Sequence, residues 1–392
     1  MTSSSSVSLR TPLLPAFALA LAAAVSLGLA RFSYALLLPT MRAELHWSYF
    51  TAGAMNTANA AGYLLGALLA PRWFARHDAL HVAVAGGLAT AVILVAHAFA
   101  AGDAALYALR TLAGVASAAT FVGGGLLAAR LSARAAHPGV VIGIYYGGTG
   151  LGILGATALV PPLPWREAWG ALGAASLLCT LGTWGVTRAS RGLVQTGPDA
   201  PAGGRAGAAW TPMAMLLAGY LLFGFGYIGY MTFIVTLLRE QGIAPAWVDA
   251  FYALLGAGVV ASSWIWAGVL QRYRGGQALA LLNAILALAT LLPVLCAQPA
   301  VVALSCLLFG CTFLSVVAST TAFVRHNLPP AAWASGIGAF TIVFALGQIL
   351  GPGLTGRLAD GPGGLARGFL CSAIVLALGA LIAWRQRPLT AG

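Results

Sequence analysis

Long runs of apolar residues, separated by short polar segments, recur along the whole chain. Runs of about 20 apolar residues are long enough for an α-helix to cross roughly 30 Å of hydrocarbon. They are continuous rather than alternating, which predicts helices and excludes the strands of a membrane β-barrel. The pattern predicts an all-α membrane protein with twelve transmembrane spans: 13–38, 48–70, 79–100, 104–129, 138–160, 166–187, 211–238, 247–270, 277–296, 300–323, 333–357 and 364–384.

The composition agrees with this pattern. Hydrophobic residues make up 60% of the chain and charged residues 7%. A soluble protein carries about a quarter charged residues to cover its surface. We therefore expect a lipid bilayer to surround most of this chain.

All 20 basic residues are arginine, and the net charge is +12. If the N-terminus is cytoplasmic, most of these arginines fall on the cytoplasmic side of the membrane. Arg42, Arg166, Arg239, Arg357 and Arg367 fall on the outer side, and Arg31 and Arg110 lie within spans. This is the positive-inside asymmetry, which predicts that both termini are cytoplasmic. The basic excess is therefore interpreted as a topology signal, and no nucleic-acid partner is expected.

The spans divide into two sets of six around a polar stretch rich in Gly, Pro, Ala and Arg. The halves resemble each other at an offset near 200, which pairs Trp47 with Trp247 and Arg72 with Arg272. Such internal symmetry is typical of transporters that bind their substrate between the halves. The predicted organisation is a tail (1–12), a six-helix bundle (13–187), a linker (188–210), a second bundle (211–384) and a tail (385–392), all tails and the linker being cytoplasmic.

No motif favours an enzyme, a metal site or a cofactor site. The five cysteines lie in predicted spans without metal-site spacing. Gly150-x-Gly-x-x-Gly155 and Gly224-x-Gly-x-x-Gly229 match a dinucleotide fingerprint, but that fingerprint requires a strand before it, and here both copies lie inside apolar spans. We expect no cofactor, no metal and no catalytic activity.

Arg31 is the most informative residue, because the segment from Leu13 to Leu38 carries no other charge. A guanidinium at that depth costs roughly 3 kcal/mol on insertion scales and stays charged. It therefore faces a protein interior or a watery cavity, where an anionic substrate is one partner. A structural pairing, or a side chain that reaches the outer interface, are the alternatives.

The architecture resembles the major facilitator superfamily, and local motifs support this. Gly66-Ala-Leu-Leu-Ala-Pro-Arg72 resembles the superfamily's loop motif with Ala70 in place of its usual Asp. Arg110-Thr-Leu-Ala-Gly114 resembles the buried-arginine motif of the fourth span. The stretches Arg31–Pro39 and Met55–Gly66, with Trp47 between them, resemble the YbfB/YjiJ-type branch. Many members of that branch are bacterial, which implies an inner-membrane location.

The resemblance also implies roles for residues. In the superfamily the arginine that matches Arg110 holds the first and fourth helices together, so we expect a structural or coupling role. The first, fifth and seventh spans line the cavity, which places Tyr34, Tyr145, Tyr146, Tyr227 and Tyr230 there as substrate contacts, with ordinary packing as the alternative. Asn59 and Gln348 are further candidate substrate contacts; Asn56, Gly351 and Pro352 are candidate structural or coupling residues.

A second resemblance concerns the substrate. Arg31-x-x-aromatic-Ala-Leu-x-x-Pro39 is similar to a pattern in organophosphate:phosphate antiporters, where such an arginine and a second one on the seventh helix bind the anion. At the internal offset, Tyr227 stands where the second arginine would be. One arginine suits one negative charge, which favours a monocarboxylate-like substrate. All eight acids fall in loops or at span ends, so the coupling ion stays open.

The leading hypothesis is therefore a secondary active or facilitative transporter of a small organic anion, which works as a monomer by alternating access. The alternatives are an exporter of amphipathic compounds, an importer of a metal chelate, and a membrane receptor or scaffold that transports nothing.

Overall fold

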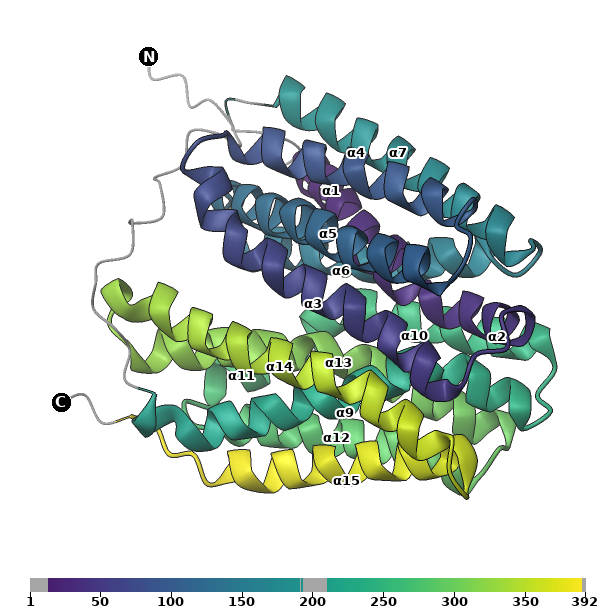
Figure 1. Ribbon diagram of the computed structural model, residues 1–392. Helices are drawn as coiled ribbons and strands as arrows, with labels where there is room; N and C mark the ends of the chain where they lie inside the picture. Colours follow the sequence, from purple (N-terminus) through teal and green to yellow (C-terminus); the bar gives the residue numbers. More distant parts are fainter. Residues whose placement is uncertain (1–12, 191, 193–209, 390–392) are drawn as a thin grey trace, which may run out of the picture.

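The computed structural model describes residues 13–190, 192 and 210–389. The predicted tail 1–12, most of the predicted linker 188–210 and residues 390–392 lie outside the described residues. All regular elements in the described part are helical (Figure 1). Each predicted span thus corresponds to helical structure, with short departures such as the end of a helix at His97 in the span 79–100 and the break at Trp266 in the span 247–270.

The helices of the first half are α1 (Leu13–Ala23), the π-helix η1 (Ala24–Phe32), α2 (Tyr34–Glu44), α3 (Tyr49–Phe74), α4 (Ala79–His97), α5 (Asp103–Ser132), α6 (Pro138–Leu159) and α7 (Trp165–Ala189). Those of the second half are η2 (Thr211–Met213), α9 (Ala214–Glu240), α10 (Pro245–Ile265), α11 (Ala267–Arg272), α12 (Gln277–Leu295), α13 (Pro299–Asn327), η3 (Pro330–Ala332), α14 (Trp333–Ala359) and α15 (Gly364–Trp384). We call the end where α7 stops and α9 starts the linker end, and the opposite end the distal end (Figure 1).

Within the described residues, eleven helical segments are long and apolar enough to cross a membrane. The chain is therefore a multi-pass membrane protein. Helix α3 has a comparable length of 26 residues but is less apolar, because it carries Asn56, Asn59 and Tyr63 among other polar positions. A twelfth span, and cytoplasmic termini, remain predictions from the sequence.

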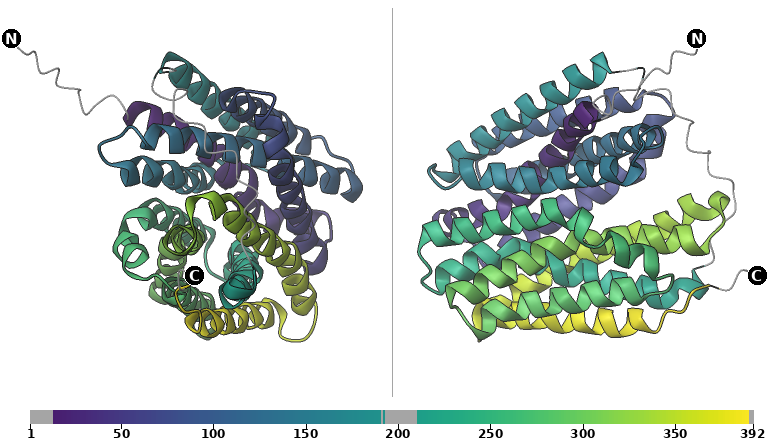
Figure 2. Two further views of the ribbon diagram at one scale, coloured as in Figure 1. Left: turned by 90° about the vertical axis from the view of Figure 1, so that its left-hand side faces the viewer. Right: turned by 180° about the vertical axis from the view of Figure 1, so that it is seen from behind.

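The two halves lie against each other as separate groups of helices (Figure 2). Helices α1–α7 form the purple-to-blue group and α9–α15 the green-to-yellow group. Extensive contacts join the groups where α3 packs against α14 and where α6 packs against α10, and a smaller contact joins α2 to α9. Any space for a ligand between the halves is therefore bounded by these contacts.

The first long helix departs from the expected α-helical geometry. Its middle, Ala24–Phe32, is a π-helix, and the Ser33 N–H donates to the Gly28 carbonyl five residues back. After this junction the Leu36 N–H bonds to Ser33 at 3.0 Å, so the Phe32 carbonyl is available to the Tyr252 hydroxyl of α10, at 2.7 Å. Such π-segments are rare and occur frequently at functional sites. This one contains Arg31.

Glycines allow the closest helix crossings. A methyl group on Gly62 would collide with the Thr111 carbonyl, and one on Gly114 with the Asn59 carbonyl, so α3 and α5 touch backbone to backbone. Small residues permit this approach in membrane helices. Gly351 likewise meets the backbone of α9, at Phe225. Helix α14 continues through Pro352 without interruption.

We expect Gly114→Ala to destabilise the protein by about 1–3 kcal/mol, because the added methyl group must push α3 and α5 apart. Gly185→Ala on α7 is the matched control, since nothing lies within 4 Å of a methyl group there. Thermal unfolding of the two purified variants in detergent measures the difference. Equal unfolding temperatures for both variants would contradict the proposed importance of this crossing.

Candidate functional site

A cavity of about 430 Å³ lies between the two halves. We call it the central cavity. Its lining comes from both groups of helices, and includes Arg31, Tyr63, Tyr145 and Tyr146 from the first half and Tyr220, Phe223, Tyr227, Phe313, Phe344 and Gln348 from the second. Because membrane-embedded cavities of this size are large enough for a small organic molecule, it is the candidate binding site.

Arg31 is the charged residue of this lining, among the residues that the structure describes. Its side chain is 3% exposed, and its Nε and Nη2 atoms are buried without a hydrogen-bond partner. None of the ion pairs between described residues includes Arg31. A buried, unpaired guanidinium is costly unless a ligand or water satisfies its donors. Two donor nitrogens of the Arg31 guanidinium are therefore left without an acceptor among the described residues.

Aromatic rings flank this guanidinium. The Arg31 Cζ atom lies 5.7 Å from the centre of the Tyr63 ring and 5.9 Å from that of Phe32. Ring faces attract cations at such distances and offset part of the cost of burial. They leave the hydrogen-bond donors of the guanidinium unused, so the site keeps its capacity for an anion.

Four further predicted contact residues also line the cavity. Tyr145 and Tyr146 come from α6, Tyr227 from α9 and Gln348 from α14. The Gln348 amide donates to the Tyr227 hydroxyl, which joins α14 to α9 at the cavity wall. The Tyr145 hydroxyl donates to the Phe121 carbonyl of α5. Tyr146 is half-buried and its hydroxyl bonds to no group in the described part of the chain.

Three predicted contact residues lie elsewhere, and for these the expectation of a cavity position was wrong for this conformation. The Tyr34 hydroxyl donates to the Ala52 carbonyl at 2.9 Å, and the Asn59 amide donates to the Arg110 carbonyl at 3.1 Å. Tyr230 hydrogen-bonds to Ser305 at 2.8 Å and stacks on Phe309. These groups bond within the packing between helices, and none of the three residues is in the lining of the central cavity.

Arg110 is at the centre of a buried polar cluster. Its Nη1 atom donates to the Ala30 carbonyl of η1 at 3.0 Å, and its Nη2 atom to the Asn56 side chain of α3 at 3.2 Å. Its guanidinium lies 4.7 Å from the centre of the Tyr34 ring. The Asn56 amide in turn donates to Thr232 of the other half at 2.7 Å. Arg110 therefore ties the π-helix that carries Arg31 to α3 and α5, and indirectly to α9.

The central cavity continues toward the linker end. A second cavity of about 500 Å³, which we call the vestibule, shares Tyr146 and Leu314 with it. The vestibule is lined by residues at the linker end of their helices, such as Gly139, Gln271 and Arg325. The vestibule therefore adjoins the central cavity on the side of the linker end.

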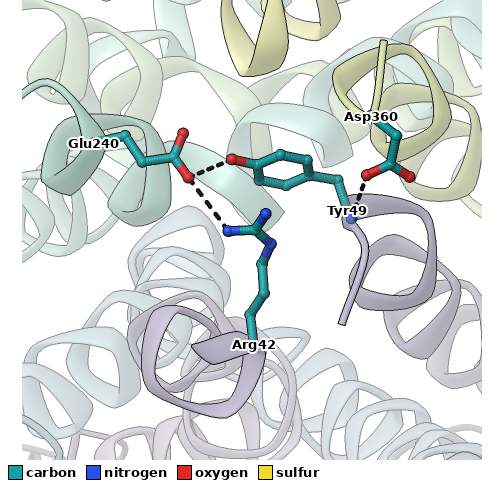
Figure 3. A network of polar contacts seen from close by, with 4 residues as sticks. All are labelled: Arg42, Tyr49, Glu240 and Asp360. Carbon is teal, nitrogen blue, oxygen red and sulfur yellow. Dashed lines mark hydrogen bonds and ion pairs between the residues drawn. The ribbon is translucent and has the colours of Figure 1, made fainter. Parts of the chain in front are cut away.

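The distal end is closed by contacts between the halves (Figure 3). Four residues make what we call the distal network: Arg42, Tyr49, Glu240 and Asp360. The Glu240 carboxylate accepts hydrogen bonds from the Tyr49 hydroxyl and from Arg42, the latter at 3.5 Å. The Asp360 carboxylate accepts from the backbone N–H groups at the start of α3, at 2.7 Å from Tyr49 and 3.0 Å from Phe50. A helix N-terminus favours such an anion.

Sequence reasoning missed Tyr63 and most of the aromatic lining. Tyr63 follows Asn56 and Asn59 at helical spacing, which places the three on one face of α3 and could have indicated it. Tyr220, Phe223 and Tyr227 similarly share a face of α9. Phe313 and Phe344 gave no such signal, because isolated phenylalanines in apolar spans look like ordinary packing residues.

Comparison with known proteins identifies the family. Residues 23–384 match the family model described as "Uncharacterised MFS-type transporter YbfB". This chain belongs to that family of the major facilitator superfamily. A chloramphenicol resistance protein of Streptomyces lividans is 28% identical to this YbfB-type protein over 292 residues, which are 70% of each chain. The resemblance to the YbfB/YjiJ-type branch is thereby confirmed.

Solved structures share the fold of the YbfB-type protein. The nucleoside transporter NupG has a TM-score of 0.70 at 16% identity, over 96% of this chain and 100% of that one. A bacterial homolog of the human lysosomal transporter Spinster has a TM-score of 0.70 at 14% identity, over 96% and 97%. The human organic anion transporter MFSD10 (TETRAN) has a TM-score of 0.64 at 14% identity, over 95% and 99%.

The distal network predicts that Asp360→Asn combined with Glu240→Gln loosens the distal end, because both carboxylates accept hydrogen bonds from the opposite half. Spin labels attached to cysteines placed at the exposed residues Ala43 and Ala246, in a background without other cysteines, would report the change. Double electron–electron resonance measures the distance between the two labels. We expect a longer label-to-label distance than in the parent. Glu167→Gln, on the exposed start of α7, is the control. An unchanged distance distribution in the double variant would show that other contacts hold this end.

Proposed function

We propose that this YbfB-type protein is a secondary active or facilitative transporter of a small organic monoanion, and that Arg31 binds the anionic group. The observation that carries the proposal is the Arg31 guanidinium, which lines the central cavity with two buried nitrogens unsatisfied and no acidic partner among the described residues. A carboxylate can accept two parallel charge-assisted hydrogen bonds from such a group.

The charge balance of the cavity supports a monoanion. Among the described lining residues, Arg31 provides the permanent charge, while the lining contains no Asp or Glu. In a low dielectric an unpaired second charge on the substrate would be strongly disfavoured. A substrate with one carboxylate matches one guanidinium, whereas a cation would be repelled.

The shape of the protein supports alternating access. The distal end is closed by Arg42, Tyr49, Glu240 and Asp360, while the vestibule leads from the central cavity to the linker end. With the linker end on the cytoplasmic side, as the arginine distribution predicts, this conformation is open to the cytoplasm. Breaking the distal network and closing the vestibule would expose Arg31 to the other side, with the two six-helix bundles, 13–187 and 211–384, as the moving units.

Arg110 and its partners fit a supporting role in this scheme. Arg110 bonds to the Ala30 carbonyl, which directly precedes Arg31, and Asn56 links it to Thr232 across the halves. We propose that this cluster holds the π-helix in place. We also propose that Gly351 and Pro352 let α14 pack tightly on both sides: Gly351 against α9 of the same half, and Pro352 against Gly53 of α3 in the other half. We further propose that the protein works as a monomer in a bacterial inner membrane.

Export of an amphipathic compound is the second candidate function. The relative from Streptomyces lividans is a chloramphenicol resistance protein, and the central cavity has an aromatic lining that would accept an uncharged amphipathic molecule. For such a compound, transport would not depend on the charge of Arg31. The dependence of transport on Arg31 therefore separates the two functions.

We expect Arg31→Ala to reduce uptake of a monocarboxylate substrate by about 10- to 100-fold at low concentration, because the charge-assisted hydrogen bonds are lost. Arg31→Lys should retain part of the activity, since it keeps the charge but loses the planar fork. Uptake of radiolabelled monocarboxylates into proteoliposomes measures the activity of both variants.

Arg188→Ala, at the exposed end of α7, is the control. Full anion uptake by a well-folded Arg31→Ala variant would refute the assignment, and chloramphenicol export by it would favour the second candidate.

A further inference from the structure

Five aromatic rings of the second half form one wall of the central cavity. We call them the aromatic stack: Tyr220, Phe223, Tyr227, Phe313 and Phe344. Phe223 and Tyr227 have ring centres 4.7 Å apart with planes 20° apart, and Phe344 lies 5.5 Å from Phe223 with planes 10° apart. Tyr227 and Phe313 are 5.9 Å apart with planes 12° apart. The rings therefore share nearly one orientation.

This shared orientation distinguishes the second half of the lining from the first. In the first half Tyr145 and Tyr146 meet edge to face, with planes 70° apart. Phe121 is tilted by 39° relative to Tyr145. Aromatic rings gain most from offset parallel or edge-to-face contacts. A flat ring that enters the cavity parallel to the stack can therefore extend it. The ring contact that the first half makes with the stack, between Phe32 and Phe313, is instead edge to face, with planes 89° apart.

The charged residue of the described lining, Arg31, lies in the first half, whereas the polar side chains that the second half adds, such as Gln348 and Thr321, are neutral. Arg31 offers Nε and Nη2, and the Tyr63 ring lies beside its guanidinium at 5.7 Å. The hydroxyls of Tyr63 and Tyr146 bond to no group in the described part of the chain, and both residues line the cavity. In the stack, by contrast, the Tyr227 hydroxyl is already bonded to Gln348. The cavity thus has an anion-binding side and an aromatic side.

We infer that the substrate is an aromatic monocarboxylate, whose carboxylate binds Arg31 and whose ring lies parallel to the rings of the aromatic stack. This inference rests on the proposed function, and it deepens it by naming the substrate class. The cavity volume of about 430 Å³ is at the small end of ligand sites, which favours one or two rings over a larger skeleton.

The test is direct binding of three compounds of similar size to the purified full-length chain, measured by isothermal titration calorimetry in detergent. Benzoate has the ring and the charge, cyclohexanecarboxylate has the charge without the aromatic ring, and benzamide has the ring without the charge. We expect benzoate to bind about three- to tenfold more tightly than cyclohexanecarboxylate, the margin typical of an aromatic contact beyond its buried area. Benzamide should bind weakest.

A matched pair of variants assigns the preference to the stack. Phe344 is half-buried, so Phe344→Leu removes one ring with limited damage to the packing. It should weaken benzoate binding by about three- to tenfold and leave cyclohexanecarboxylate binding nearly unchanged. Phe99→Leu is the control, because Phe99 lies between α4 and α5 with 81% of its surface exposed. That variant should bind both acids as the parent does.

The outcomes separate this inference from the proposed function. Equal binding of the two acids, with weak benzamide binding, would overturn the aromatic inference and leave an anion carrier. Benzamide binding as tight as benzoate binding would overturn the charge assignment to Arg31, and with it the proposed function. Saturable binding of neither acid would overturn the aromatic inference, and the Arg31→Ala uptake experiment would then decide the proposed function separately.

Discussion

A positive charge inside a membrane protein, without an acidic partner among the residues that the structure describes, is the constraint on which this structure depends. The Nε and Nη2 atoms of the Arg31 guanidinium are buried and have no hydrogen-bond acceptor within the described residues. The surroundings reduce this cost only in part, through the rings of Phe32 and Tyr63. A cavity that admits water or an anion is the remaining way to solvate the guanidinium. The buried guanidinium therefore depends on the cavity for its solvation.

The fold keeps this charge apart from the carboxylates that could neutralise it. Glu240 and Asp360 lie at the distal end, where they join the two halves, and Glu44 lies near Arg166 and Trp165. Arg110 is held by the Ala30 carbonyl and the Asn56 amide oxygen, which carry no net charge. These three carboxylates thus lie outside the described lining of the central cavity, in which Arg31 is the charged residue.

The sequence predicted the helices well because apolar runs and polar breaks control where membrane helices begin and end. The expected span 138–160 is the helix Pro138–Leu159, and 364–384 is Gly364–Trp384. Side-chain direction was harder to predict. A run that is apolar on all sides does not indicate which face meets a cavity, so Tyr34 and Tyr230 were expected in the lining yet bond within helix packing. The π-helix had no sequence signal, because its backbone depends on contacts such as that between Phe32 and Tyr252.

Under the proposed function, the bound substrate neutralises the buried positive charge of the carrier. When the cavity is empty, closing the vestibule would remove water from an uncompensated guanidinium, which a low dielectric makes expensive. When a monocarboxylate is bound, the closing cavity holds a neutral pair, and the cost falls. The loaded carrier would then change conformation more readily than the empty one, without any membrane-buried carboxylate. A binding site with one arginine and an aromatic wall can in this way couple the conformational change to substrate binding. The charge that attracts the substrate also opposes closure of the vestibule when no substrate is bound.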